Sequence, residues 1–274
     1  MPKTILITGA TDGIGLETAR RLSTDGHHLL IHGRNTDKLC KTAADLRAMP
    51  DAGPVEAWRA DLSDLSQVAR LARDVRAAHS RIDVVINNAG VLKTDHPTTT
   101  DGQDVRFVVN TLAPALLTRL LLPAIPQGGR VVHLSSAAQA PVDLAALSGQ
   151  RALEAMEAYA QSKLALTMWS QALASELGKD GPVTVAVNPG SLLATNMVRK
   201  GFGVAGNDIG IGADILVRAA LTEEFSDASG LYFDNDTLRF APPHADAANA
   251  AKLAGVVEAI EKRIVAYLQA ARDA

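Results

Sequence analysis

Short apolar segments alternate with longer amphipathic segments along most of the chain. The apolar segments are rich in β-branched residues and end at turn residues, which is typical of strands buried on both faces of a parallel sheet. Strands are predicted over residues 3–8, 28–32, 55–59, 82–87, 130–134 and 183–187. Helical spacing of apolar residues predicts helices over 13–24, 37–48, 65–79, 105–122 and 153–177.

This alternation predicts an α/β fold. Strands joined by helices of such length form right-handed crossovers, so we expect a doubly wound, mostly parallel sheet with helices on both faces. No linker rich in proline, glycine or serine divides the chain, and a single domain is expected over residues 1–274.

The periodic pattern weakens after residue 189. Five glycines lie between residues 201 and 212, and this density favours a mobile loop over a packed helix. We expect the segment 191–215 to form a lid that closes over a ligand. Helical spacing returns over residues 245–270, where an amphipathic helix is expected to dock on the core.

Composition and charge narrow the class of protein. The 274 residues include 27 Lys plus Arg and 30 Asp plus Glu, a net charge of −3, which argues against nucleic acid or a membrane surface as partner. The single Cys40 forms no internal disulfide, and without a Cys/His cluster in the sequence no metal is expected. No apolar run approaches the roughly 18 residues of a membrane span, so a cytoplasmic enzyme is expected.

The first predicted strand ends in a glycine-rich turn, Thr8-Gly-Ala-Thr-Asp-Gly-Ile-Gly15. Glycines let the backbone approach a pyrophosphate, and the helix that starts near Gly13 presents free N–H groups. A purely structural turn is the alternative. The residues expected to contact a dinucleotide are Gly9, Thr11, Asp12, Gly13, Ile14 and Gly15.

The second strand leads into Gly33-Arg34-Asn35. Gly33 stands where folds that select NAD place a carboxylate, whereas an arginine here accommodates a 2′-phosphate. We therefore expect Arg34 and Asn35 to bind the cofactor, with NADP(H) preferred and NAD(H) possible. A solvated loop arginine is the alternative, and Asp12 in the glycine turn adds no positive charge for the phosphate, which weakens the case.

Two further strands end in polar residues that suit a cofactor crevice. Asp61, followed by Leu62, is placed to accept from an adenine amino group, or it serves as a turn or N-cap residue. The next strand ends in Asn87-Asn-Ala-Gly90, whose residues Asn88, Ala89 and Gly90 are expected at the carboxyl edge of the sheet.

The long predicted helix carries Tyr159 and Lys163, which share one face because they are four residues apart. A neighbouring ammonium favours phenolate and would bring the tyrosine pKa toward neutrality, as an acid or base requires. Ser136, after a strand, is placed to bind a substrate oxygen. Asn110 either satisfies a helix backbone group or links a proton relay to Lys163.

The motifs described above, in the order in which they occur along the chain, resemble those of the short-chain dehydrogenase/reductase family. They run from Thr8-Gly-x-x-x-Gly-x-Gly15 through Asp61, Asn87-Asn-Ala-Gly90, Asn110, Ser135-Ser136 and Tyr159-x-x-x-Lys163 to Asn188-Pro-Gly190. The resemblance implies catalytic Asn110, Ser136, Tyr159 and Lys163. It also implies a seven-stranded Rossmann sheet of order 3-2-1-4-5-6-7, with a final strand near 231–233, and a homodimer or homotetramer.

Two departures separate the chain from the common family pattern. An insert at residues 139–156 resembles that of the retinol dehydrogenase and protochlorophyllide reductase branch and is expected to line the substrate entrance. The family motif Pro-Gly-x-x-x-Thr appears here as Pro189-Gly190-Ser191-Leu-Leu-Ala-Thr195, which is one residue longer. Either Thr195 or Ser191 is therefore expected to contact the nicotinamide carboxamide.

The leading hypothesis is an NADP(H)-dependent oxidoreductase that transfers hydride between nicotinamide and a carbonyl or secondary alcohol. Tyr159 acts as the general acid or base, and Lys163 also binds the nicotinamide ribose. Ser136, Tyr159, Leu192 and Met197 are the expected substrate contacts, and the apolar residues of the lid suggest a hydrophobic small molecule. The alternatives are an NAD(H)-dependent dehydrogenase of the same family and a dinucleotide-sensing protein without turnover.

Overall fold

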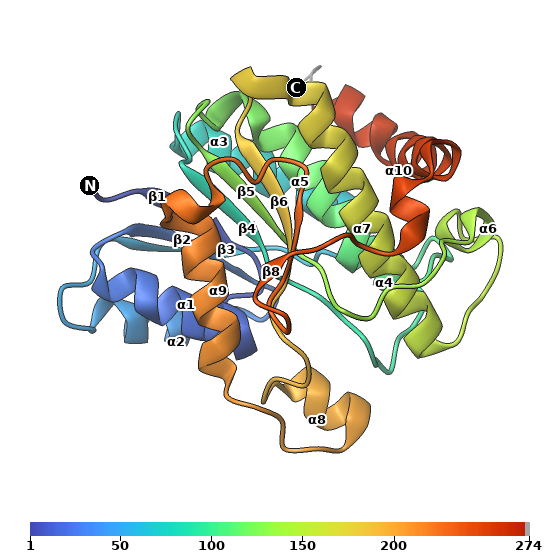
Figure 1. Cartoon of the computed structure of the whole chain (residues 1–274). Helices are drawn as coiled ribbons and strands as arrows, with labels where there is room; N and C mark the ends of the chain where they lie inside the picture. The colour runs from blue at the N-terminus through green and yellow to red at the C-terminus, as the bar shows by residue number, and fades with distance from the viewer. Residues whose placement is uncertain (272–274) are drawn as a thin grey trace.

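The computed structural model describes residues 1–271, apart from the side chain of Phe202, and it centres on one eight-stranded sheet (Figure 1). The strands are β1 (Thr4–Ile7), β2 (His28–Gly33), β3 (Val55–Arg59), β4 (Val84–Asn87), β5 (Arg130–Leu134), β6 (Val183–Asn188), β7 (Tyr232–Asp234) and β8 (Arg239–Phe240). Their order is β3-β2-β1-β4-β5-β6-β7-β8, so the predicted doubly wound α/β fold is confirmed.

The sheet has one strand more than predicted. All neighbouring pairs from β3 to β7 are parallel, whereas β8 pairs antiparallel with β7. Aromatic packing holds this edge hairpin, because the ring of Phe240 lies 5.1 Å from that of Phe233 and 5.3 Å from that of Phe225. A two-residue strand has too little periodicity to be recognised in the sequence.

Helices cover both faces of the sheet (Figure 1). They are α1 (Gly13–Thr24), α2 (Thr36–Arg47), α3 (Leu65–Ala78), α4 (Val105–Phe107), α5 (Ala113–Leu121), α6 (Leu144–Leu147), α7 (Ala155–Leu177), α8 (Asn196–Phe202), α9 (Ile209–Leu221) and α10 (Ala250–Ala270). One core cluster lies under α1, α2 and α9. The other lies under α3, α5, α7 and α10, so the predicted C-terminal helix does dock on the core.

The predicted helix 105–122 is not continuous. A π turn, η1 (Val108–Leu112), separates α4 from α5, and a 3₁₀ turn follows at Leu122–Ala124. By length and composition the stretch Val105–Ala124 would be able to cross a membrane, but 83% of its most apolar window is buried inside the protein. Such burial is typical of a core helix.

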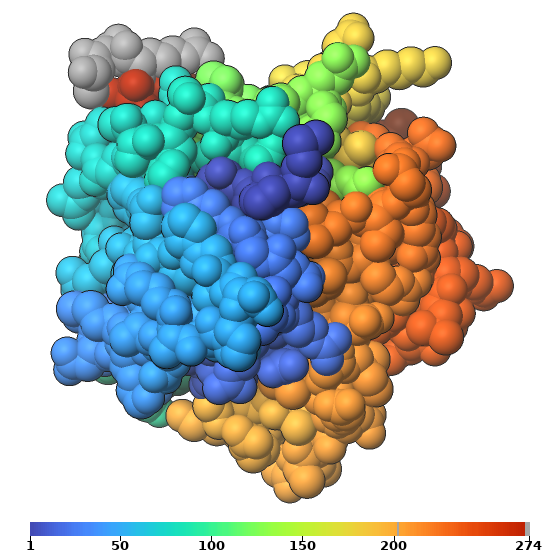
Figure 2. Space-filling view, turned by 90° about the vertical axis from the view of Figure 1, so that its left-hand side faces the viewer, coloured from blue at the N-terminus to red at the C-terminus, as the bar shows by residue number. Residues whose placement is uncertain are grey.

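The expectation of a loop throughout 191–215 is wrong, because this segment contains α8 and the start of α9. A Cβ on Gly212 would lie only 2.5 Å from Leu193 Cδ1 and 3.3 Å from Ile14 Cδ1. The glycine therefore allows α9 to pack closely on α1 instead of breaking the helix. The α8 segment stands out at the lower edge of the molecule in Figure 2, beside the N-terminal elements.

Candidate active site

The glycine turn after β1 forms a tightly packed cradle. Gly9 and Gly13 have positive φ of 67° and 58°. A Cβ on Gly15 would lie 2.4 Å from both Asn88 Nδ2 and Gly9 O, and Asn88 Nδ2 donates to Thr8 O at 2.8 Å. The N–H groups of the first turn of α1 have no intrahelical acceptors, so this backbone fits a pyrophosphate.

Asp12 and Thr11 shape the mouth of this turn. Asp12 is the N-cap of α1, accepts from Gly13 N at 2.7 Å, and also accepts from Asn196 Nδ2 at the start of α8. A Cβ on Gly33 would lie 2.6 Å from Thr11 Cγ2, so the glycine at the end of β2 gives Thr11 its space. The turn, β2 and α8 thus meet at one place.

Arg34 follows the end of β2 and is exposed, which fits both the predicted 2′-phosphate contact and the alternative of a solvated loop arginine. Arg59 at the end of β3 is also exposed, and its Nε donates to Arg34 O at 3.3 Å. The sequence reasoning missed Arg59, although the parallel register that pairs Arg59 with Gly33 brings it there. Asn35 caps α2 by accepting from Lys38 N at 2.9 Å.

His32 is a second residue that the sequence reasoning missed. Its Nδ1 accepts from Gly9 N at 3.3 Å, and its Nε2 lies 3.0 Å from Ala60 O, an arrangement that needs a neutral ring with the proton on Nε2. Burial lowers the pKa of His32 to about 4, which keeps the ring neutral. The only signal in the sequence was a polar residue inside an apolar strand.

Asp61 is a turn residue in this structure. Its Oδ1 accepts from Ser63 N at 2.9 Å and from Ser63 Oγ at 2.7 Å, whereas the N-cap of α3 is Asp64. The alternative of Asp61 as an N-cap is therefore wrong. Both bonds use Oδ1, so the other carboxylate oxygen of Asp61 remains available for the predicted contact with an adenine amino group. Leu62 is buried beside it.

Lys163 lies beneath the carboxyl edge of the sheet with only 3% of its surface exposed. Its Nζ donates to Leu134 O at 2.6 Å and lies 5.7 Å from the ring centre of Tyr159. Burial lowers the pKa of Lys163 to about 8. The amine is thus able to exchange a proton close to neutral pH.

Tyr159 and Ser136 face each other across this edge. Burial raises the pKa of Tyr159 above its usual value, and a hydrogen bond with Ser136 acts in the opposite direction. The prediction that the ammonium lowers this pKa is therefore wrong. The physical reason is that desolvation dominates, while Lys163 Nζ is directed at the Leu134 carbonyl group.

Asn110 lies in the π turn and reaches across to the loop after β4. Its Oδ1 accepts from Val91 N at 2.8 Å, and its Nδ2 donates to Val91 O and Ser162 Oγ, both at 3.0 Å. A Cβ on Gly90 would lie 3.4 Å from Asn110 Oδ1 and 3.5 Å from Lys163 Nζ. Asn110 therefore satisfies backbone outside its own helix and lies near Lys163, as a relay requires.

The loop after β6 separates the two candidates for a carboxamide contact. Ser191 N and Oγ donate to Asp236 at 2.8 Å and 2.6 Å, which ties Ser191 to the turn after β7. Thr195 Cγ2 lies 3.5 Å from the Cβ position of Gly13, and Thr195 caps α8. The structure thus brings Thr195 to the glycine turn. Pro189 O accepts from Asn235 Nδ2 at 2.9 Å, and Gly190 N donates to Asn188 Oδ1 at 3.3 Å.

The two expected substrate contacts on the lid occupy different positions. Met197 Cε lies 3.8 Å from the Cβ position of Gly90, which is next to Lys163 and Asn110. Leu192 has a positive φ of 52° and 45% of its surface exposed. Met197 therefore lies beside the site, whereas Leu192 is exposed to solvent. Ala89, the remaining predicted residue of this loop, donates its N–H to Thr8 Oγ1 at 3.1 Å.

A Rossmann sheet with a polar site at its carboxyl edge defines a class of dinucleotide-binding oxidoreductases. The short chain dehydrogenase family model matches residues 3–202, and the chain belongs to this family. Within the family it lies near the retinol dehydrogenases. Human retinol dehydrogenase 13 is 31% identical over 265 residues, which cover 89% of this chain and 80% of the human protein.

A bacterial protein and two solved structures are also similar. A Streptomyces protein (strain C5) assigned as a daunorubicin C-13 ketoreductase is 35% identical over 268 residues, covering 92% of this chain and 90% of its own. The structure of an uncharacterized Mycobacterium paratuberculosis protein is similar with a TM-score of 0.77 and 31% identity, and the match covers 95% of this chain and 92% of that one. The structure of a Burkholderia cenocepacia short chain dehydrogenase in complex with NADP is similar with a TM-score of 0.66 and 26% identity, and the match covers 85% of this chain and 95% of that one.

Proposed function

We propose that this protein is an NADP(H)-dependent oxidoreductase that interconverts a carbonyl compound and its alcohol, with Tyr159 as general acid and base. The observation that carries the proposal is the convergence of Ser136, Tyr159 and buried Lys163 beside a glycine turn that fits a pyrophosphate. Belonging to the short chain dehydrogenase family supports the reaction class.

The cofactor site is formed by residues from the carboxyl ends of β1 to β4 and from the loop after β6. The bound nicotinamide supplies or accepts the hydride. The residues proposed to hold it are Gly9, Thr11, Asp12, Gly13, Ile14, Gly15, Arg34, Asn35, Asp61, Leu62, Asn88, Ala89, Gly90, Tyr159, Lys163, Pro189, Gly190 and Thr195. Ser191 is less suited to contact the carboxamide, because Asp236 binds both its N–H and its hydroxyl.

The proton chemistry rests on four side chains. Ser136 and Tyr159 donate hydrogen bonds to the substrate oxygen, and Tyr159 gives up its proton as the alcohol forms. Lys163, whose pKa is lowered to about 8, is suited to return that proton at neutral pH. Asn110 holds the backbone of Val91 next to this amine and lines the route by which protons reach it.

Arginines support NADP(H) as the preferred cofactor. Arg34 and Arg59 place two positive charges where the adenine ribose of a dinucleotide lies in this fold. The similar Burkholderia dehydrogenase was solved in complex with NADP, which agrees with this preference.

The substrate is proposed to be a large and mostly apolar carbonyl compound or alcohol. Exposed apolar side chains lie in the insert and the lid, namely Leu144, Met156, Leu192, Val204 and Ile211. Such residues favour an apolar ligand, because each buried CH₂ group contributes about 0.8 kcal/mol. Retinol and daunorubicin, the molecules in the names of two relatives, are both of this kind.

Replacement of Tyr159 by phenylalanine tests the proposal. With a panel of aldehydes and ketones of increasing apolar size, we expect Tyr159→Phe to lower kcat by about 10²–10⁴-fold, because general acid catalysis is lost. NADPH binding, followed by cofactor fluorescence, should fall far less than kcat, because all the other residues proposed to hold the cofactor are kept.

Tyr267→Phe, a matched change on the surface helix α10, is the control and should retain full activity. An unchanged rate in Tyr159→Phe would refute the assignment of this residue. A wild-type protein that binds NADPH without oxidising it over the whole panel would instead indicate a dinucleotide sensor.

A further inference from the structure

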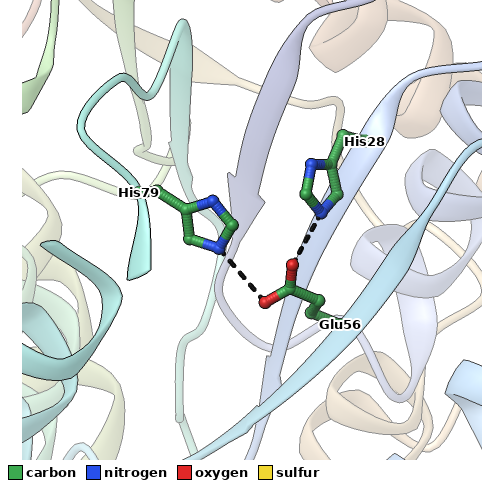
Figure 3. A group of neighbouring side chains, drawn as sticks. All are labelled: His28, Glu56 and His79. Carbon is green, nitrogen blue, oxygen red and sulfur yellow. Dashed lines mark hydrogen bonds and ion pairs between the residues drawn. The ribbon is translucent and has the colours of Figure 1, made fainter. Parts of the chain in front are cut away.

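Three side chains with metal-binding atoms converge at the amino ends of β2 and β3 (Figure 3). His28 begins β2, Glu56 lies in β3, and His79 is the C-cap of α3. His28 Nε2 lies 2.8 Å from Glu56 Oε1, and His79 Nε2 lies 3.1 Å from Glu56 Oε2. Each carboxylate oxygen thus faces one imidazole nitrogen.

This cluster is separate from the candidate active site. Parallel strands end together, so the glycine turn after β1 and Arg34 after β2 lie at the carboxyl edge of the sheet. His28 and Glu56 lie at the opposite, amino edge, at or next to the start of their strands. Nothing in the proposed oxidoreductase chemistry uses them.

The donor set suits a zinc-class ion. Two imidazole nitrogens and one carboxylate are a ligand set that Zn²⁺ accepts, with an open fourth position for water. The three ligand atoms lie within 4.8 Å of one another. Tetrahedral zinc, with bonds of about 2.0–2.1 Å, holds its ligands about 3.3 Å apart, so modest side-chain rotations bring them into place.

Burial and packing also fit such a site. The side chains of His28, Glu56 and His79 are 27%, 39% and 13% exposed, so an ion and a completing water have access. The two imidazole rings pack edge to face at 5.2 Å, and Trp58 packs on His79 at 6.2 Å. These contacts restrict the rings that would hold the metal.

We propose that His28, Glu56 and His79 bind one divalent transition-metal ion of the zinc class. The ion links β2, the edge strand β3 and the C-terminal end of α3. Because Glu56 lies 28 residues from His28 and 23 residues from His79 in the chain, such a link stabilises the folded chain against unfolding. Its role is structural and independent of the hydride-transfer site.

Calorimetry with ZnCl₂ on tag-free, EDTA-treated protein tests the proposal. We expect one Zn²⁺ per chain and, at about a hundred times Kd, a rise in Tm of roughly 5 °C. Glu56→Gln and His79→Gln should each weaken binding at least roughly tenfold, because each removes a ligand. His96→Gln, a matched change at an exposed loop histidine, should bind as wild type.

Trp58 provides a local readout. Ni²⁺ or Cu²⁺ at the site should quench its fluorescence, and Trp58→Phe should abolish this quenching while Trp169, buried in the core, remains. Thermal unfolding in EDTA checks that each variant is folded, and His28→Gln replaces any variant that is not. The proposal fails if no stoichiometric binding occurs, or if the ligand variants bind Zn²⁺ as tightly as wild type, which would leave a hydrogen-bonded triad only.

Discussion

At the level of single residues, two arginines at the ends of neighbouring strands support the proposed preference for NADP(H). Arg34 is the residue that the sequence singled out, and the register of β2 and β3 adds Arg59. Their contact is through the Arg34 carbonyl group, so both guanidinium groups keep donors for a phosphate. A phosphate that accepts from both is held by charge-assisted hydrogen bonds.

Alanine at either position should therefore discriminate between the cofactors. A hydrogen bond to a charged group contributes about 1.5–3 kcal/mol, so we expect Arg34→Ala and Arg59→Ala each to lower kcat/KM for NADPH by about 10–100-fold. The value for NADH should hardly change, since NADH has no 2′-phosphate. Steady-state kinetics with both cofactors measures this.

Arg73→Ala, at an exposed arginine of α3 paired with Asp74, is the matched control and should affect neither cofactor. Equal losses with NADPH and NADH in Arg34→Ala would show that this arginine does not read the 2′-phosphate.

At the level of elements, the backbone of the loop after β5 is held by one residue of β7 and by one residue of the loop itself. Tyr232 of β7 donates its hydroxyl to Ser136 O at 3.1 Å, and Gln139 Nε2 donates to the same oxygen at 3.0 Å. Burial raises the pKa of Tyr232 well above its usual value, so its hydroxyl stays protonated and remains a donor. Both residues thus position the backbone that carries the Ser136 hydroxyl.

Removing the Tyr232 hydroxyl should loosen Ser136 without disrupting the fold. We expect Tyr232→Phe to lower kcat by about 2–10-fold, corresponding to one hydrogen bond, while KM for NADPH stays constant. Gln139 still satisfies the Ser136 carbonyl, so little stability is lost. A change in NADPH KM with constant kcat would contradict this positioning role.

At the level of the whole molecule, His32 and His133 are the most deeply buried histidines of the described residues, 3% and 0% exposed, and both are uncharged. The pKa of His32 is lowered to about 4 and that of His133 to about 3, mainly by burial. In the unfolded chain both titrate near 6.5. The unfolded state therefore binds more protons than the folded state below that pH, and acid favours unfolding.

Folding stability should consequently fall as the pH drops from about 6.5 toward 4, and the His32 contribution should level off below 4. For His32 the gap between the two pKa values corresponds to about 3 kcal/mol. Urea unfolding at a series of pH values measures this for wild type, for His32→Asn, whose slope should be shallower, and for His96→Gln. A His32→Asn slope equal to that of wild type would rule out this contribution.

Local patterns in the sequence were sufficient to predict much of this protein. Six strands, the principal helices, the glycine turn and the Tyr159–Lys163 pair follow from periodicity and short spacings, because each depends on residues close together in the chain. The order of motifs also indicated the family, which the comparisons confirmed.

Tertiary structure alone decided the rest. Arg59, His32, Asp236 and the His28–Glu56–His79 cluster acquire their partners through strand register and packing between residues far apart in sequence. The glycines near α9 indicated a loop in isolation, but against α1 they allow close helix packing. The pKa of Tyr159 likewise depends on desolvation, which local spacing does not reveal. Periodicity therefore specified the elements, whereas burial and long-range contacts specified their chemistry.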